Sequence, residues 1–108
     1  MLQLSQKKII DLLGIAQRAN CIVSGDYAVQ SVLCEKKAKL LLIAADAAIE
    51  TKKNYEYLAN KYQIPYHYVL TKESLGACIG KSFRAAVVVV DDGFAQATAA
   101  LIRSMEKN

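Results

Sequence analysis

The chain has 108 residues, of which 54% are hydrophobic, and it carries a formal net charge of +4 with a sequence pI near 9.0. This length and composition suffice for one buried core, so we expect a single domain over residues 1–108. The sequence shows neither a cleavable leader nor an apolar run long enough to cross a bilayer. We therefore expect a cytoplasmic protein without membrane contact, and the basic balance favours a polyanionic partner if the cations share one face.

Apolar spacing and turn residues divide the chain into alternating helices and strands. Helical periodicity predicts helices over residues 5–19, from residue 26 onward, and over 46–62, 71–80 and 92–105. Short apolar runs predict strands over residues 21–23, 39–44, 66–70 and 87–90. The expected helix N-caps are Ser5, Asp46, Thr71 and Asp92. This alternation predicts an α/β fold, a three-layer α/β/α sandwich around a mostly parallel mixed sheet.

Residues that could support catalysis or cofactor binding are few and scattered. His67, the only histidine, lies in the middle of a predicted strand, where packing is favoured over a catalytic role. The glycines form neither of the two common phosphate-binding fingerprints. The pair Asp91 and Asp92 follows a strand, but helix capping explains it better than metal binding. We therefore expect no enzymatic activity, no cofactor and no metal site.

Cysteine and tyrosine placement also favours packing over chemistry. The three cysteines are widely spaced and contain no C-x-x-C pair, so we expect buried free thiols. Five of the six tyrosines fall between Tyr55 and Tyr68. We expect this cluster to pack a helix against a strand, with the hydroxyls at the solvent edge.

The turn at Ser24, Gly25 and Asp26 is the best candidate for an anion site. It begins a predicted helix, whose free backbone N–H groups and dipole favour a phosphate, although the Asp26 carboxylate opposes this. Further basic residues follow the same helix or flank the last loop; they are Lys36, Lys37, Lys39, Lys81 and Arg84. If the fold gathers them, they form one basic patch. Otherwise they are scattered solubilising charges, and composition leaves both interpretations open.

Three segments, which together cover nearly the whole chain, resemble the kink-turn-binding ribosomal proteins of the L-seven-Ae family. The first is the block over residues 25–46, with KAKLLLIAAD at residues 37–46 as its clearest part. The second is LGACIG at residues 75–80, which resembles the family's L-G-x-A-x-G turn. The third, LGIAQRA at 13–19 followed by VSG at 23–25, is similar to the bacterial YlxQ-type branch. The resemblance implies a non-catalytic partner of structured RNA, such as ribosomal RNA, acting as a monomer or within a ribonucleoprotein.

The resemblance also implies where RNA would bind. The family's G-[ST]-N-[EQ]-x-x-K pattern reads the sheared G·A pairs of a kink-turn, whereas here Gly25 is followed by Asp26, Tyr27, Ala28 and, at the lysine position, Ser31. Ala28 cannot hydrogen-bond a base edge, and Ser31 lacks the length and charge of lysine. We therefore expect binding mainly through phosphates, with stacking by Tyr27 and by the loop over residues 81–84. The candidate RNA-binding residues are Ser24, Gly25, Asp26, Tyr27, Gln30, Ser31, Lys36, Lys37, Lys81, Ser82, Phe83 and Arg84. For Phe83, a role as a core anchor beneath the loop is equally open.

Three functions remain in competition at this point. The first is a structured-RNA-binding protein that stabilises an RNA fold. The second is a regulatory or scaffold protein on the same fold that has lost kink-turn specificity, and the third is a recognition domain serving an RNA-modifying enzyme on a partner chain. A basic patch on one face favours the first over the second. We also expect the loops around Gly25, Asp46 and Gly80 to meet at one end of the sheet, as loops do in parallel α/β units.

Overall fold

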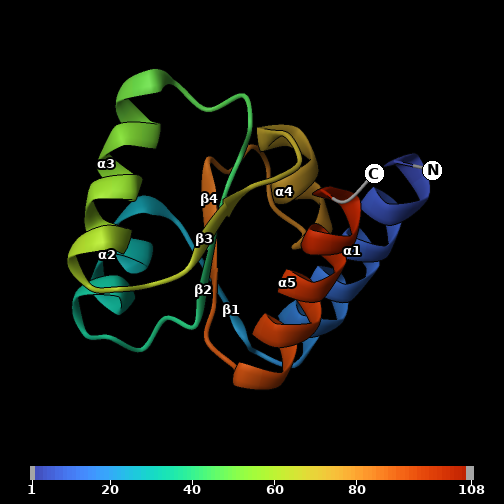
Figure 1. Ribbon diagram of the computed structural model, residues 1–108, viewed down its shortest axis with the longest axis horizontal. Helices are drawn as coiled ribbons and strands as arrows, with labels where there is room; N and C mark the ends of the chain where they lie inside the picture. The colour runs from blue at the N-terminus through green and yellow to red at the C-terminus, as the bar shows by residue number, and fades with distance from the viewer. Residues whose placement is uncertain (1, 107–108) are drawn as a thin grey trace.

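The computed structural model describes residues 2–106, with side chains described for residues 6–105. The elements are α1 (Leu2–Arg18), β1 (Ile22–Ser24), α2 (Asp26–Cys34), β2 (Leu40–Ile43), α3 (Ile49–Lys61), β3 (Tyr66–Tyr68), α4 (Lys72–Cys78), β4 (Ala86–Val89) and α5 (Asp92–Glu106). Figure 1 shows α2 and α3 on one face of the sheet and α1, α4 and α5 on the other. The α/β/α sandwich is confirmed. The first helix begins before Ser5, the expected N-cap, whose side chain lies outside the described set.

The sheet is mixed, as expected, but it is not mostly parallel. Its strand order is β1-β4-β2-β3, and only β2 and β3 pair in parallel. The strand β4 runs antiparallel to both of its neighbours, β1 and β2. A parallel strand requires a connection that returns the chain to the opposite end of the strands. The seven-residue helix α4 is only about 10 Å long at 1.5 Å per residue. The strand β4 therefore starts at the end of the sheet where β3 finishes and runs in the opposite direction.

The two central strands form the middle of the core. All four residues of β2 and all four of β4 are buried, as expected for continuous apolar runs covered on both faces. On the α1 side, Ile9, Leu13 and Ala16 recur at helical spacing and are fully buried. Helices on both faces therefore remove the central strands from water, and the edge strands β1 and β3 remain half-exposed.

Two expected caps concern the loops around α3 and α4. Thr71 caps α4 as expected, because its hydroxyl accepts a hydrogen bond from the Ser74 backbone N–H at 3.1 Å. Asp46 does not cap α3, which follows Ala48 without any side-chain cap. The Asp46 carboxylate instead accepts a hydrogen bond from the backbone N–H of Lys72 at 2.8 Å. This bond ties the loop after β2 to the start of α4.

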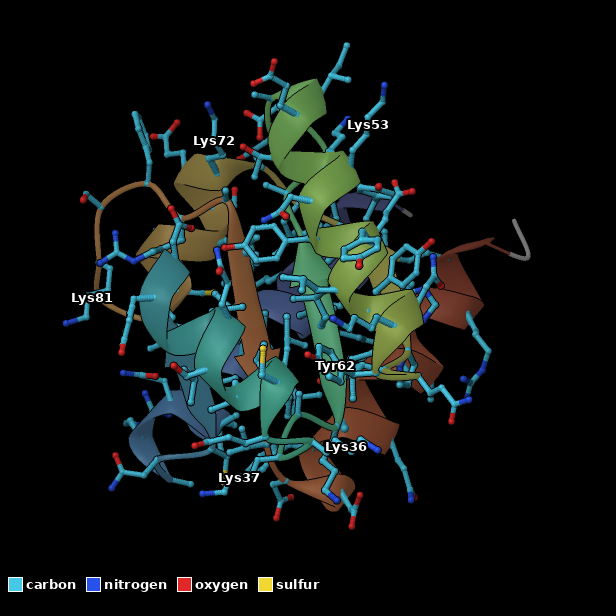
Figure 2. All side chains as sticks on the ribbon, turned by 90° about the vertical axis from the view of Figure 1, so that its left-hand side faces the viewer. Lys36, Lys37, Lys53, Tyr62, Lys72 and Lys81 are labelled. Carbon is cyan, nitrogen blue, oxygen red and sulfur yellow. The ribbon has the colours of Figure 1, made fainter. Side chains whose placement is uncertain are left out.

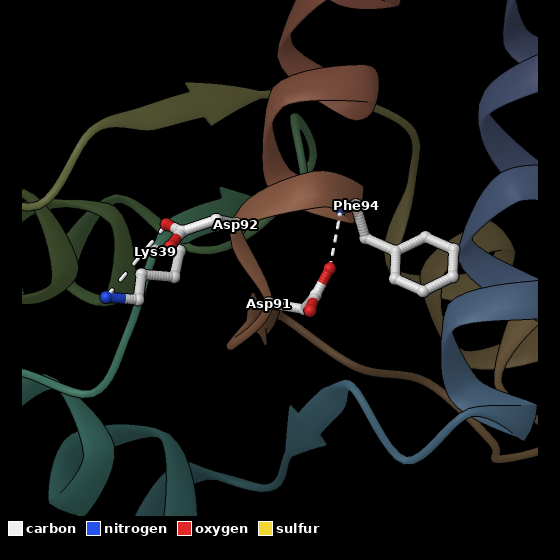
Figure 3. Close-up of polar contacts among 4 residues, drawn as sticks. All are labelled: Lys39, Asp91, Asp92 and Phe94. Atoms are coloured by element: carbon white, nitrogen blue, oxygen red, sulfur yellow. Dashed lines mark hydrogen bonds and ion pairs between the residues drawn. The ribbon is translucent and has the colours of Figure 1, made fainter.

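The cap of α5 is Asp91 rather than the expected Asp92. Figure 3 shows the Asp91 carboxylate accepting a hydrogen bond from the Phe94 backbone N–H, at 2.9 Å. The Asp92 side chain points the other way and lies 4.0 Å from the ammonium of Lys39. An N-cap is the residue just before the first helical residue, and α5 begins at Asp92, so the capping position falls to Asp91.

The three cysteines are free thiols, as expected, but they are not all buried. Cys21 and Cys78 are half-buried, whereas Cys34 at the end of α2 is exposed. Burial raises the pKa of the Cys78 thiol to about 11. Within residues 2–106, no three His, Cys, Asp or Glu side chains come together in a way that could hold a metal ion. None of the helices in that range combines the length and apolarity that crossing a bilayer requires.

The loops around Gly25, Asp46 and Gly80 do meet at one end of the sheet. Strand register places the last residue of β1, Ser24, and the last residue of β2, Ile43, beside the start of β4 at residues 86–87. The reason differs from the one expected. The loop over residues 80–85 lies there because it leads into an antiparallel strand.

Gly76 in α4 should be the glycine least tolerant of a side chain. A Cβ at this position would lie 1.5 Å from the Ser82 carbonyl oxygen, and the Gly76 carbonyl itself accepts the Lys81 backbone N–H at 2.8 Å. Because backbone rather than a flexible side chain would have to move, we expect Gly76→Ala to lower the free energy of unfolding by at least about 2 kcal/mol. Thermal unfolding followed by circular dichroism measures this as a drop of roughly 10 °C in the midpoint.

Gly14→Ala is the matched control within α1. Its Cβ would meet only the Cys78 carbonyl oxygen at 3.5 Å, an ordinary contact, and alanine favours the helix by up to about 1 kcal/mol. Equal stability of the two variants would show that the loop over residues 80–85 does not pack on α4 as described.

Candidate nucleic-acid interface

The candidate residues at the start of α2 and in the last loop come together around a hollow of about 300 Å³. This hollow, called the loop hollow below, is lined by Gly25, Asp26, Lys72, Phe83, Arg84, Ala85 and Ala86. Four of these residues were predicted as candidates on separate segments, and the fold brings them together: Gly25, Asp26, Phe83 and Arg84. Lys72 was not predicted. The available signal was the Thr71 cap, which places the next residue at the same end of the sheet as Gly25.

The start of α2 leaves backbone N–H groups free beside the loop hollow. Gly25 precedes the helix at φ 93°, a left-handed conformation that suits glycine, and it provides no side-chain cap. The first intrahelical bond runs from the Val29 N–H to the Gly25 carbonyl. The preceding N–H groups therefore have no acceptor within the helix. Together with the positive end of the helix dipole, they favour an anion at this point.

The Asp26 carboxylate, which opposes anion binding, is held by a buried tyrosine. The Tyr55 hydroxyl donates a hydrogen bond of 2.7 Å to the Asp26 Oδ1, and Tyr55 is only 2% exposed. This corrects the expectation that the clustered tyrosine hydroxyls all lie at the solvent edge. Burial, followed by the hydrogen bond to Asp26 and the charge of Asp26, raises the pKa of Tyr55 well above its ordinary range. The bond fixes the Asp26 side chain against α3.

Arg84 provides a cation whose donors are not used up by the protein. Its backbone N–H bonds the Lys72 carbonyl at 3.0 Å, and its Nη1 donates to the Phe83 carbonyl at 2.9 Å. Its Nε is buried without a hydrogen-bond partner, and the described carboxylates lie more than 4.0 Å from the guanidinium. Buried donors are normally satisfied, and an arginine fork matches the oxygens of a phosphate.

Two aromatic rings stand exposed on this side of the molecule. Tyr27 on α2 is 87% exposed and Phe83 in the loop is 66% exposed. Phe83 is therefore not a core anchor beneath the loop. Tyr27 also lines a second hollow on the outer face of α2, called the helix hollow below, together with Gln30, Ser31, Cys34 and Glu35. Exposed rings of this kind can stack on unpaired bases.

The remaining candidates do not join a single basic patch. Lys36 and Lys37 follow the carboxyl end of α2, so they lie at the opposite end of the helix from Gly25. Figure 2 shows them at the bottom of the face that α2 and α3 form, well below Lys72 and Lys81. Ser24 is half-buried at the end of β1, and Ser82 is exposed in the loop. The cations thus occupy both ends of one face.

Tyr55→Phe should remove the bond that fixes Asp26. Losing a buried donor to a charged acceptor should reduce the free energy of unfolding by about 1–3 kcal/mol at neutral pH, as measured by urea denaturation. Because the folded state holds the pKa of Tyr55 above its unfolded value of about 10, this contribution is complete below pH 10 and declines as the pH rises further. The difference between wild type and variant should therefore narrow above pH 10.

Tyr57→Phe is the control on the same helix, since the Tyr57 side chain is 62% exposed. Its loss of a hydroxyl should change stability by no more than about 0.5 kcal/mol. A Tyr55→Phe variant as stable as this control would contradict the assigned role of the hydrogen bond.

The sequence matches a family of known proteins over most of its length. Residues 7–99 match the sequence model of the ribosomal protein L7Ae/L30e/S12e/Gadd45 family. The RNA-binding protein YlxQ of Bacillus subtilis is 40% identical over 91 residues, which cover 84% of this chain and 91% of that protein. The YlxQ protein of Enterococcus faecium is 31% identical over 98 residues, covering 91% and 94% of the two chains.

Solved structures share the fold. A protein with unknown function from Bacillus halodurans superposes with a TM-score of 0.84 at 36% identity, covering 89% of this chain and 97% of that one. The Giardia lamblia 15.5kD RNA binding protein superposes with a TM-score of 0.76 at 22% identity, covering 98% and 88% of the two chains. Because the sequence match spans most of the chain, the protein belongs to the ribosomal protein L7Ae/L30e/S12e/Gadd45 family.

Proposed function

We propose that this protein binds structured RNA, either kink-turn-like or ribosomal, without catalysing a reaction. The observation that carries the proposal is the Arg84 guanidinium, which has no carboxylate partner among the described residues, beside the uncapped start of α2. Both features call for an anionic acceptor, and the loop hollow places them together. Family membership and the RNA-binding relatives in Bacillus subtilis and Enterococcus faecium support a polynucleotide as the source of that anion.

Phosphate contacts should dominate the affinity. Arg84 and Lys72 supply positive charge at the loop hollow, Lys81 lies on the loop that leads to it, and the Asp26 carboxylate is restrained by Tyr55. On α2, the positions from which the family reads bases can make few hydrogen bonds to them, since Ala28 has no side-chain donor or acceptor. We therefore expect weak preference among RNA sequences and recognition chiefly of backbone shape.

Stacking should add a preference for RNA with an unpaired base. Tyr27 at the start of α2 and Phe83 at the loop hollow are both exposed, and either can hold such a base while the cations hold the neighbouring phosphates. Simultaneous binding of a phosphate backbone and an extruded base stabilises a bent RNA. This is the action expected of a component of a cytoplasmic ribonucleoprotein, working as a monomer within that assembly.

Arg84→Ala should weaken binding to a kink-turn RNA and to a plain duplex by a similar factor. Each cation that neutralises a phosphate contributes about one unit, or slightly less, to the slope of log affinity against log salt. The slope should therefore become shallower by about that amount in titrations at several salt concentrations. Lys8→Ala is the control, because this substitution also removes one positive charge, but from an exposed position on α1, on the other face of the sheet.

Tyr27→Ala should act differently, because stacking depends on the RNA and hardly on salt. We expect a loss of roughly 1–3 kcal/mol in binding free energy for an RNA with an unpaired base, and none for a plain duplex. The same titrations measure both effects.

Two outcomes would contradict the phosphate-dominated mechanism. Absence of binding to either RNA at low salt would favour a regulatory or scaffold protein that has lost RNA recognition. A strong preference for the kink-turn that the Tyr27→Ala variant keeps would mean that Asp26, Gln30 or the α2 backbone reads the G·A pairs.

A further inference from the structure

A second group of aromatic and basic side chains lies on α3 and on the free edge of the sheet beside it. We call it the tyrosine–lysine strip, and its members are Lys52, Tyr57, Lys61, Tyr62, Tyr66 and Tyr68. Tyr66 and Tyr68 alternate with His67 along β3, so both point to the same face of the sheet. Lys52 of α3 lies over Tyr68, which identifies that face as the one covered by α3.

The lysines of the strip pair with rings and not with carboxylates. The Lys61 ammonium lies 5.9 Å from the Tyr57 ring centre and 5.4 Å from that of Tyr62. The Lys52 ammonium lies 5.4 Å from the Tyr68 ring centre. Among the described residues, neither lysine has a carboxylate oxygen within 4.0 Å. Their charges are therefore available to an anion, and the rings they flank keep their positions.

Two of the four rings of the strip are exposed, and Tyr62 and Tyr66 are half-buried. Tyr57 is 62% exposed and Tyr68 is 39% exposed, whereas Tyr55 on the inner side of the same helix is buried. Tyr66 meets Tyr68 edge to face, with ring centres 6.2 Å apart, which holds the Tyr68 ring upright at the edge of the sheet. Helix α3 also carries Glu50 and Glu56, so net charge alone would not select a ligand here.

The strip is continuous with the candidate interface. Helices α2 and α3 pack side by side on the same face of the sheet. Cys34, the last residue of α2, lines the helix hollow and lies close enough to Tyr62 to raise the pKa of the Tyr62 hydroxyl. A chain that lies along the outer face of α2 therefore reaches Tyr62 and Lys61 without leaving the surface.

We infer that the tyrosine–lysine strip binds an unpaired RNA strand that extends from the structured RNA held at α2 and the loop hollow. Each of the two clusters of the strip, Lys52 with Tyr66 and Tyr68 and Lys61 with Tyr57 and Tyr62, matches part of a single strand, in which every base offers a face for stacking and every linkage a negative charge. An acidic protein segment would satisfy the lysines but would leave the rings unused. The inference rests on the proposed function for the structured part of the RNA.

The test compares three RNA probes. They are a plain duplex, the same duplex with a single-stranded uridine tail at one end or the other, and the isolated uridine oligonucleotide. A tail should increase wild-type affinity roughly fivefold or more, the factor expected when at least one base stacks on an aromatic side chain. Tyr57→Ala should abolish this gain and leave affinity for the plain duplex unchanged.

Matched variants separate stacking from other effects. Tyr57→Phe retains the ring and should retain the gain, and Lys8→Ala on the other side of the sheet should change nothing specific to the tail. Arg84→Ala should weaken binding of the duplex with and without the tail equally, because it lies at the loop hollow. Because Tyr57 is exposed, replacing it should leave the fold intact. The midpoint of thermal unfolding, measured for every variant, checks that the fold is retained.

The outcomes distinguish this inference from the proposed function. If the duplex binds but the tail adds nothing, or if Tyr57→Ala keeps the gain, the strip inference is overturned and the proposed function stands. If the isolated oligonucleotide binds the wild type but not Tyr57→Ala, while the duplex does not bind, the strip stands and the proposed function fails. Failure of all three probes to bind the wild type would overturn both.

Discussion

The antiparallel insertion of β4 between β1 and β2 determines where the candidate interface forms. Because β4 runs against its neighbours, its amino end lies beside the carboxyl ends of β1 and β2. The loop that leads into it is thereby brought next to the start of α2. Had β4 been parallel to β2, that loop would lie at the other end of the sheet, and Arg84 would be about the length of a strand away from Gly25.

Backbone interactions then hold the gathered loops in place. Lys72 is central to them, since its N–H bonds the Asp46 carboxylate and its carbonyl accepts the Arg84 N–H. The close approach of Gly76 to Ser82 fixes the other side of the same loop. These contacts use main-chain atoms or short side chains, which leaves the long side chains of Lys72, Phe83 and Arg84 to line the loop hollow. Such a site is organised before a ligand arrives, which reduces the entropy lost on binding.

The polar groups at the start of α2 show how one acidic residue can coexist with an anion site. An unrestrained Asp26 would occupy the positive end of the helix dipole in place of a phosphate. The Tyr55 hydroxyl instead holds it against α3. The two aromatic roles on α3 are thus distinct, because Tyr55 organises the start of α2 from within, and the exposed Tyr57 faces outward beside Lys61, which has no carboxylate partner among the described residues.

The sequence by itself determined what depends on local pattern. Continuous apolar runs predicted strands at residues 39–44 and 87–90, where the structure has buried strands at 40–43 and 86–89. Helical spacing predicted the start of α2 and both ends of α1, α3, α4 and α5 to within a few residues. Ordered segment matches also identified the family. Tertiary structure decided the direction of β4, the separation of Lys36 and Lys37 from Arg84, and the pairing of Asp26 with Tyr55, 29 positions away. It also recruited Lys72, which carries no motif of its own. Periodicity reports which face of an element is buried, but strand direction and the meeting of distant side chains depend on how connections close in space, and no local window of sequence contains that information.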